Sequence, residues 1–138
     1  MYKRTQHKIN PIDLDVDVST GIGLPMSGAK YGTFNSLYTS KEQIIANLKN
    51  LILTMKGERV MEPEFGTDVY RVIFENMGDG RTNKALSSNI KASVKRWMPL
   101  LNITDVTSTT DEHDLNIAIS FTVPGYAISE DILINIQR

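Results

Sequence analysis

The chain has 138 residues, with 15 Lys and Arg against 16 Asp and Glu, so its formal net charge is -1, and it has no cysteine. This length fits one domain with a single core, because it can bury about two-thirds of the surface of the unfolded chain. The near-neutral charge excludes a general attraction to nucleic acid or anionic lipid, and the lack of cysteine excludes disulfides, thiolate metal sites and thiol nucleophiles.

The first 39 residues are rich in Gly, Pro, Ser and Thr and predict an extended N-terminal arm. Between Ile12 and Val18, apolar residues alternate with three aspartates, a period-2 pattern that predicts a strand with one solvated face. The aspartates are Asp13, Asp15 and Asp17. They also resemble the start of a calcium loop, but Val18 and Leu24 stand where that loop needs Gly and Glu. We therefore expect a strand that adds to a sheet edge, its own or a partner's.

A first helix is predicted to begin at Thr39 or Ser40, each of which has a Glu or Gln three residues later, the spacing of a capping box. Its apolar stripe runs over residues 44–55, and Gly57 supplies the stop. Polar side chains interrupt this stripe, so it cannot span a bilayer. The N-terminus lacks the apolar block of a secretory signal, so we expect residue 1 to start the working protein.

A rigid turn is predicted between the first and second helices. Pro63 fixes its own φ and disfavours helix at the residue before it, while Gly66 permits a sharp reversal. A second helix is then expected to start at Thr67 or Asp68, with one apolar stripe. The stripe consists of Val69, Val72, Ile73 and Met77, with Phe74 beside it.

A third helix is predicted from a cap at Thr82 to Trp97 or Met98, where Pro99 ends it. One face of this helix is apolar and is expected to be buried: Leu86, Ile90, Val94 and Trp97. The roughly opposite face carries Lys84, Lys91 and Lys95. Such a row is compatible with contact to nucleic acid or an acidic protein, although a solvated helix face is the commoner explanation of it.

The C-terminal third predicts three strands, at residues 103–109, 115–123 and 130–137. Apolar residues alternate with polar ones along the last two of these segments, which is typical of strands with one buried face. We expect an α+β fold: the N-terminal arm (1–39), then a single domain (40–138) of about three helices on one face of an antiparallel sheet of three or four strands.

The sequence predicts no catalytic, metal or cofactor site and no small-molecule substrate. Glu62 and Glu64 flank Pro63 and superficially resemble a glycosidase pair, but two neighbours on one short turn cannot straddle a sugar. We expect them to cap helix amides or to pair with Arg59 or Arg71. His7 and His113 do not share metal-ligand spacing.

Three segments together resemble, in order and spacing, the lysozyme-like baseplate wedge family, the sheath initiators of contractile phage tails of the T-even type, with relatives in type VI secretion baseplates. They are Gly57-Glu58-Arg59, Pro63-Glu64-Phe65-Gly66-Thr67-Asp68 and Ile73-Phe74-Glu75. The resemblance implies a non-enzymatic virion protein of the tail baseplate, assembled in the host cytoplasm. Its implied partners are the helical core bundle of the wedge, the tail sheath subunit and, as further candidates, the tail tube or central hub.

The resemblance also suggests where the partners bind. Relatives carry Glu-Pro-Arg around the proline that corresponds to Pro99, at the surface that docks on the wedge core. The docking candidates here are therefore Trp97, Met98, Pro99 and Leu100, with apolar groups in place of the charged pair. The alternative is that these residues are buried as core at the end of the helix. The structural-turn residues are Arg59, Pro63, Glu64, Phe65 and Gly66.

Sheath contact is expected through strand addition at a free sheet edge. The candidates are Ile132, Ile134, Ile136, Asp13, Asp15 and Asp17, and the sequence leaves open which strand forms the edge. Two alternatives come from other functional classes: a small nucleic-acid-binding or regulatory domain that uses the lysine row, and a peptidoglycan glycosidase.

Overall fold

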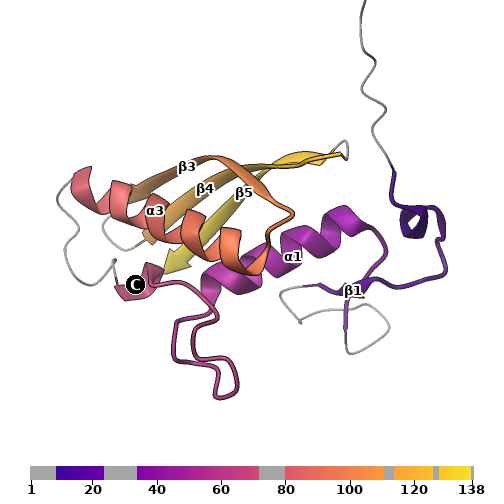
Figure 1. Cartoon of the computed structure of the whole chain (residues 1–138), viewed down its shortest axis with the longest axis horizontal. Helices are drawn as coiled ribbons and strands as arrows, with labels where there is room; N and C mark the ends of the chain where they lie inside the picture. The colour runs from indigo at the N-terminus through magenta and orange to yellow at the C-terminus, as the bar shows by residue number, and fades with distance from the viewer. Residues whose placement is uncertain (1–8, 24–33, 72–79, 111–113, 126–127, 138) are drawn as a thin grey trace, which may run out of the picture.

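The computed structural model describes residues 9–23, 34–71, 80–110, 114–125 and 128–137 and shows an α+β chain (Figure 1). In chain order its elements are a 3-10 helix η1 (Pro11–Leu14), strands β1 (Gly21–Ile22) and β2 (Ser36–Leu37), helices α1 (Ser40–Leu53) and α3 (Gly80–Trp97), and strands β3 (Asn102–Thr110), β4 (Asp114–Val123) and β5 (Ile128–Gln137). Residues 69–71 are also helical.

The three C-terminal strands form one antiparallel sheet in the order β3-β4-β5. Every second residue of the central strand β4 is buried, from Leu115 to Val123. This is the alternation that the sequence predicts, and it confirms the three-stranded sheet with one buried face. The pairing of β4 with β5 is regular over ten residues, whereas β3 has a register shift between Ile103 and Asp105.

The buried face of the sheet and the two long helices share one core. Helix α3 contacts β3, helix α1 contacts β5, and the two helices contact each other, so both lie on the same side of the sheet (Figure 1). The largest fully buried side chains are Phe121, Leu48, Leu51, Ile52, Ile90, Ile117 and Ile119. Each such side chain stabilises the fold by about 1.5–3 kcal/mol relative to an exposed one. The core therefore fixes α1 and α3 on the sheet.

Helix α1 begins at the predicted residue but ends before the predicted one. Thr39 is the N-cap, and its Oγ1 accepts a hydrogen bond from Glu42 N at 3.3 Å. The helix stops at Leu53, because Thr54 leaves helical geometry and Met55 forms a parallel bridge with Thr67. Met55 is therefore not part of the helical stripe, and the pairing with a later segment overrides the local apolar pattern.

Helix α3 starts at Gly80, two residues before the predicted Thr82, and ends at Trp97, as Pro99 predicts. The apolar face is largely as expected: Leu86, Ile90 and Val94 are buried, and Trp97 is half-buried. The second helix is helical at its described residues 69–71, which agrees with a start at or just after Asp68. The rest of its stripe, with Val72, Ile73 and Met77, lies outside the described residues.

The predicted strand over residues 12–18 is wrong. Pro11 begins the 3-10 helix η1, the Asn10 side chain accepts a hydrogen bond from Ile12 N, and Asp17 N donates to Asp15 Oδ1. These local bonds satisfy the backbone inside the segment and compete with strand pairing. The two-stranded sheet of the N-terminal region is instead formed by β1 and β2, which pair antiparallel.

Candidate docking surfaces

A long loop over residues 54–68 carries the predicted turn and projects from the helical side of the molecule (Figure 1). Its base is closed by Thr67 N, which donates to Thr54 O at 2.9 Å, and its neck by Gly57 N, which donates to Pro63 O at 2.7 Å. Gly66 has φ +115°, and a Cβ there would lie 2.4 Å from Thr54 O. Only glycine fits this crossing, because the backbone of Thr54 and Met55 occupies the space of a side chain.

The tip of this loop is held by stacked side chains. The Arg59 guanidinium lies 3.8 Å from the centroid of the Phe65 ring, and Phe65 meets Trp97 edge to face at 5.2 Å. Cation–π and aromatic pairs of this kind each contribute about 0.5–1.5 kcal/mol. Between these contacts Val60 and Met61 are 94% and 91% exposed, so an ordered loop presents two apolar side chains to solvent.

Two polar contacts tie the loop to α3. The Arg96 guanidinium forms an ion pair with the Glu64 carboxylate, and the Asp68 carboxylate accepts hydrogen bonds from Lys56 Nζ at 2.7 Å and Asn89 Nδ2 at 3.0 Å. The partner of Glu64 is thus Arg96 and not Arg59 or Arg71 as expected. Sequence reasoning missed Arg96 and Asn89 because they lie on a different element, and no local spacing links them to the loop.

The contacts to Asp68 lower the pKa of its carboxyl, chiefly through the hydrogen bond from Lys56 and then the one from Asn89. Because the pKa is lower in the folded than in the unfolded chain, this group stabilises the fold above the unfolded pKa, and the contribution is lost as the pH falls through the folded pKa. We expect Asp68→Asn to lower the free energy of unfolding by about 1 kcal/mol at pH 7, and the gap to wild type to narrow below about pH 4. Urea unfolding between pH 3 and 7 measures this difference in free energy of unfolding. A difference that grows in acid would contradict the role given to the Asp68 carboxylate.

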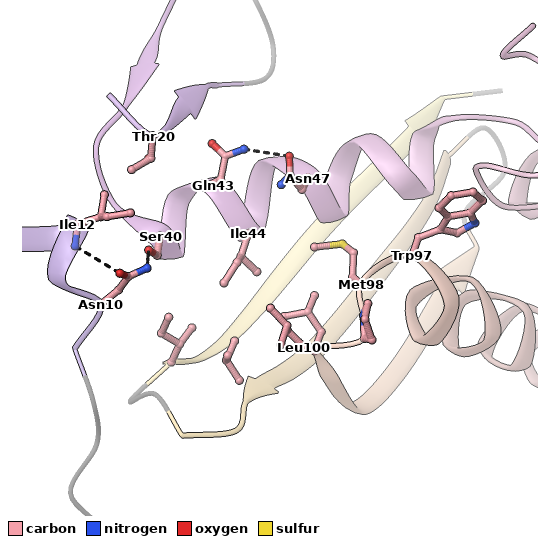
Figure 2. Close-up of a pocket in the computed structure, with 14 residues that line it drawn as sticks. Asn10, Ile12, Thr20, Ser40, Gln43, Ile44, Asn47, Trp97, Met98 and Leu100 are labelled. Atoms are coloured by element: carbon pink, nitrogen blue, oxygen red, sulfur yellow. Dashed lines mark hydrogen bonds between the residues drawn. The ribbon is translucent and has the colours of Figure 1, made fainter. Parts of the chain in front are cut away.

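The predicted docking residues line an apolar groove of about 460 Å³ (Figure 2). It is formed by five segments: the η1 region, Thr20 before β1, the first turns of α1, the α3–β3 connection and the β4–β5 end of the sheet. Its lining residues are Asn10, Ile12, Thr20, Ser40, Gln43, Ile44, Asn47, Trp97, Met98, Pro99, Leu100, Leu101, Val123 and Ile128. The structure therefore brings all four docking candidates together at one hollow surface.

The groove has an apolar wall and a polar rim. In Figure 2, Ile44, Met98 and Leu100 approach one another across the groove, and the amides of Gln43 and Asn47 lie along its upper side. Leu100 is 76% exposed although it belongs to this apolar wall. Gln43 Nε2 donates to Asn47 Oδ1 at 3.2 Å, whereas the buried Gln43 Oε1 has no hydrogen-bond partner. This buried oxygen faces Gly21, so the surface open to a partner is the apolar wall, which an apolar segment would complement.

The η1 region is held against α1 at the edge of this groove. Asn10 Nδ2 donates to Ser40 Oγ at 2.8 Å, and Asp13 Oδ1 accepts from Ser40 N at 2.6 Å, so the Asp13 carboxylate binds a free amide at the start of α1. Asp15 and Asp17 are exposed. Of the three arm aspartates, Asp13 thus binds within the protein, while Asp15 and Asp17 are exposed to contact with a partner.

The remaining sheath-contact candidates lie on β5, a strand that has no further strand beside it in the described part of the chain. The side chains of Ile132, Ile134 and Ile136 point into the core, with exposed fractions of 4%, 4% and 5%. Leu133, on the opposite face, is 69% exposed. A partner at this edge would therefore meet the main chain and the outer-face side chains, while the isoleucines fix the strand in place.

The carboxylates that flank Pro63 are those of Glu62 and Glu64. Both are exposed on the projecting loop, Glu64 is paired with Arg96, and neither lines the groove. Within the described ranges no three His, Asp or Glu side chains are grouped so that they could hold a metal ion, and no helix there has the length and apolar character to cross a membrane. His7 and His113 lie outside the described residues.

Comparison with solved structures supports this fold. A crystal structure of a Geobacter sulfurreducens protein that is named for its likeness to tail lysozymes aligns with a TM-score of 0.65 and 23% identity, over 73% of this chain and 93% of that one. A chain of the anti-feeding prophage baseplate aligns with a TM-score of 0.56 and 19% identity, over 85% of this chain and 83% of that one. At these identities the likeness shows the fold alone.

Sequence comparison identifies the family. Baseplate wedge protein gp25 of Enterobacteria phage T4 is 33% identical over 79 residues, which is 56% of this chain and 59% of that relative, so the match spans less than two-thirds of the relative's length. The model of the family described as baseplate wedge protein gp25 matches residues 39–126, more than half of this chain. The protein therefore belongs to the baseplate wedge protein gp25 family.

Proposed function

We propose that the chain is a structural, non-enzymatic subunit of a contractile-tail baseplate, which docks on neighbouring wedge proteins through the groove and starts the first ring of sheath at the free edge of β5. The observation that carries this proposal is that the family match coincides with a surface of docking type: an apolar groove at the α3–β3 connection, with Leu100 largely exposed. The family places the protein in the tail baseplate.

The groove is suited to an apolar segment of a neighbouring wedge protein, for which the helical core bundle is the candidate. Met98 and Leu100 offer apolar surface, and Pro99 between them restricts the backbone, so little conformational entropy is lost on binding. Apolar side chains in a concave site with a polar rim are the usual composition of an interface core. Docking here would depend on buried surface rather than on ion pairs.

The β5 edge is suited to strand addition by the sheath. Its ten residues pair with β4 without a register shift, so the outer main-chain groups form an uninterrupted row of donors and acceptors. The opposite edge, β3, has an irregularity between Ile103 and Asp105, a feature that weakens pairing at natural edges. We therefore assign the incoming sheath strand to β5, with the tail tube or central hub as neighbours of the same assembly.

Docking is tested by exchanging one exposed leucine for glutamate. Leu100→Glu should reduce recovery of the wedge-core proteins of the same tail, co-expressed with this chain and purified on its tag, by at least about tenfold, because a carboxylate must be desolvated in the apolar groove. Leu133→Glu is the matched control, since Leu133 is 69% exposed but lies on β5 away from the groove. Equal recovery with both variants would rule out the groove as the docking site.

A further inference from the structure

One face of α3 carries three cations that the fold leaves unpaired. Among the described residues Lys41 and Lys56 have carboxylate partners, and Arg96 pairs with Glu64, whereas Lys84, Lys91 and Lys95 have none. At 100° per residue these three lysines fall within about 40° of one another around the helix axis, so they form a single row. The row covers about 16 Å of helix length at 1.5 Å per residue.

This row borders a second groove, which is distinct from the docking groove and from the β5 edge. It has a volume of about 480 Å³ and lies between α3 and β3. Its lining residues are Asn83, Lys84, Ser87, Ser88, Lys91 and Val106. The lining thus contains two ammonium groups, hydroxyl and amide groups and one apolar side chain, but no carboxylate. A hydrogen bond from Ser108 Oγ to Asn83 Oδ1 at 2.7 Å joins helix and strand at one end.

The strand beside this groove also has an open edge. No strand pairs with the outer side of β3 among the residues that the structure describes, so its main-chain donors and acceptors are open on that side, and Val106 of this strand lines the groove. The one acidic residue of β3, Asp105, pairs in register with Ser120 and is exposed on the solvent face of the sheet. It therefore does not neutralise the lysines, which lie on the helix side.

The charge and the shape of the groove between α3 and β3 indicate which class of ligand it can bind. A positive groove without a carboxylate favours an acidic ligand, and a strand edge offers pairing to a polypeptide backbone that a phosphodiester backbone cannot use. Three lysines in one row are also few for duplex DNA, whose specific binders neutralise about 6–10 phosphates.

We propose that the groove between α3 and β3 binds an extended, acidic segment of a partner protein, with carboxylates against Lys84 and Lys91 and the backbone along β3. The test uses the full-length protein and a fluorescein-labelled peptide of alternating Glu and Thr, matched to the six residues of β3 from Asp105 to Thr110, which pair with β4 without a register shift. Fluorescence anisotropy should show binding that weakens at least about tenfold in K84E/K91E, because two attractions become two repulsions. Binding should also fall steeply with added salt.

The control variant is K41E/K49E, which makes the same change in net charge on α1. It should bind the peptide as the wild type does, and thermal unfolding checks that both variants are folded. A peptide with N-methyl groups on alternate residues should bind more weakly if the backbone pairs with β3. Three results would each overturn the proposal: equal binding by the two double variants, undiminished binding of the N-methylated peptide, or lysine-dependent binding of duplex DNA without binding of the peptide.

Discussion

Replacing Gly66 with alanine should lower the free energy of unfolding by about 3 kcal/mol or more. Two effects add at this position. A φ of +115° is strained for any residue with a Cβ, at a cost of about 1–3 kcal/mol. The new Cβ would also lie 2.4 Å from Thr54 O and 3.1 Å from Met55 C, and these atoms belong to the backbone, so no side chain can rotate away. Overpacking of this kind costs about 1–3 kcal/mol in addition.

Gly57→Ala is the matched control for this prediction. Gly57 lies in the same loop and has φ +90°, but nothing stands within 4 Å of its hypothetical Cβ. The substitution therefore carries the conformational strain without the clash and should cost only about 1–2 kcal/mol. Urea unfolding of the two variants beside wild type measures the difference. If Gly66→Ala were no more destabilising than Gly57→Ala, the close crossing of residues 54 and 66 would not exist in solution.

The position of Gly66 explains why this loop matters for docking as well as stability. The crossing positions Phe65 against Trp97 and Glu64 against Arg96, so the loop is attached to α3 within four residues of Met98 and Leu100. Loss of the crossing would free the end of α3 from this support. We expect Gly66→Ala to weaken wedge docking in addition to stability, since groups in a binding surface depend on the contacts that hold them in place.

Local patterns predicted the parts of the fold that local physics decides. The alternation along β4, the Thr39 cap of α1 and the end of α3 before Pro99 each depend on a few neighbouring residues, and all three are found in the structure. The predicted strand over residues 12–18 is wrong because other local interactions decide the structure there. Pro11 and Asn10 form a competing local structure that an apolar alternation does not reveal.

The docking surfaces could be predicted only in part, because they are made by tertiary contacts. Pro99 and its neighbours were identified through a resemblance, yet the groove also requires Ile12 and Ile44, which come from two other segments. The partner of Glu64 is 32 residues away on α3. No periodicity in one sequence specifies such pairs, since they follow from the packing of whole elements.

At the β5 edge, the double substitution Leu133→Lys with Asn135→Lys should reduce the number of baseplates that carry sheath by at least about tenfold. Both side chains are exposed on the outer face of β5, beside the place that an incoming strand would take. Lysines on an edge strand oppose pairing, because their charges must be desolvated under the added strand. Each lost cross-strand contact removes about 0.2–1 kcal/mol more. Electron microscopy of assembled particles counts the baseplates with and without sheath.

The control places the same two lysines at the other edge. Thr107→Lys with Thr109→Lys adds the same charge on the same exposed face of the sheet, but on β3. Neither variant alters a buried side chain, but Asn135→Lys removes the exposed hydrogen bond from Asn135 Nδ2 to Asn116 Oδ1, so the β5 variant should unfold at a slightly lower temperature. The β3 variant should carry sheath like wild type. The reverse outcome, loss of sheath with the β3 lysines alone, would move the incoming strand to β3. Unchanged sheath in both variants would mean that strand addition to this sheet does not start the sheath, because each free edge would then have been blocked without effect.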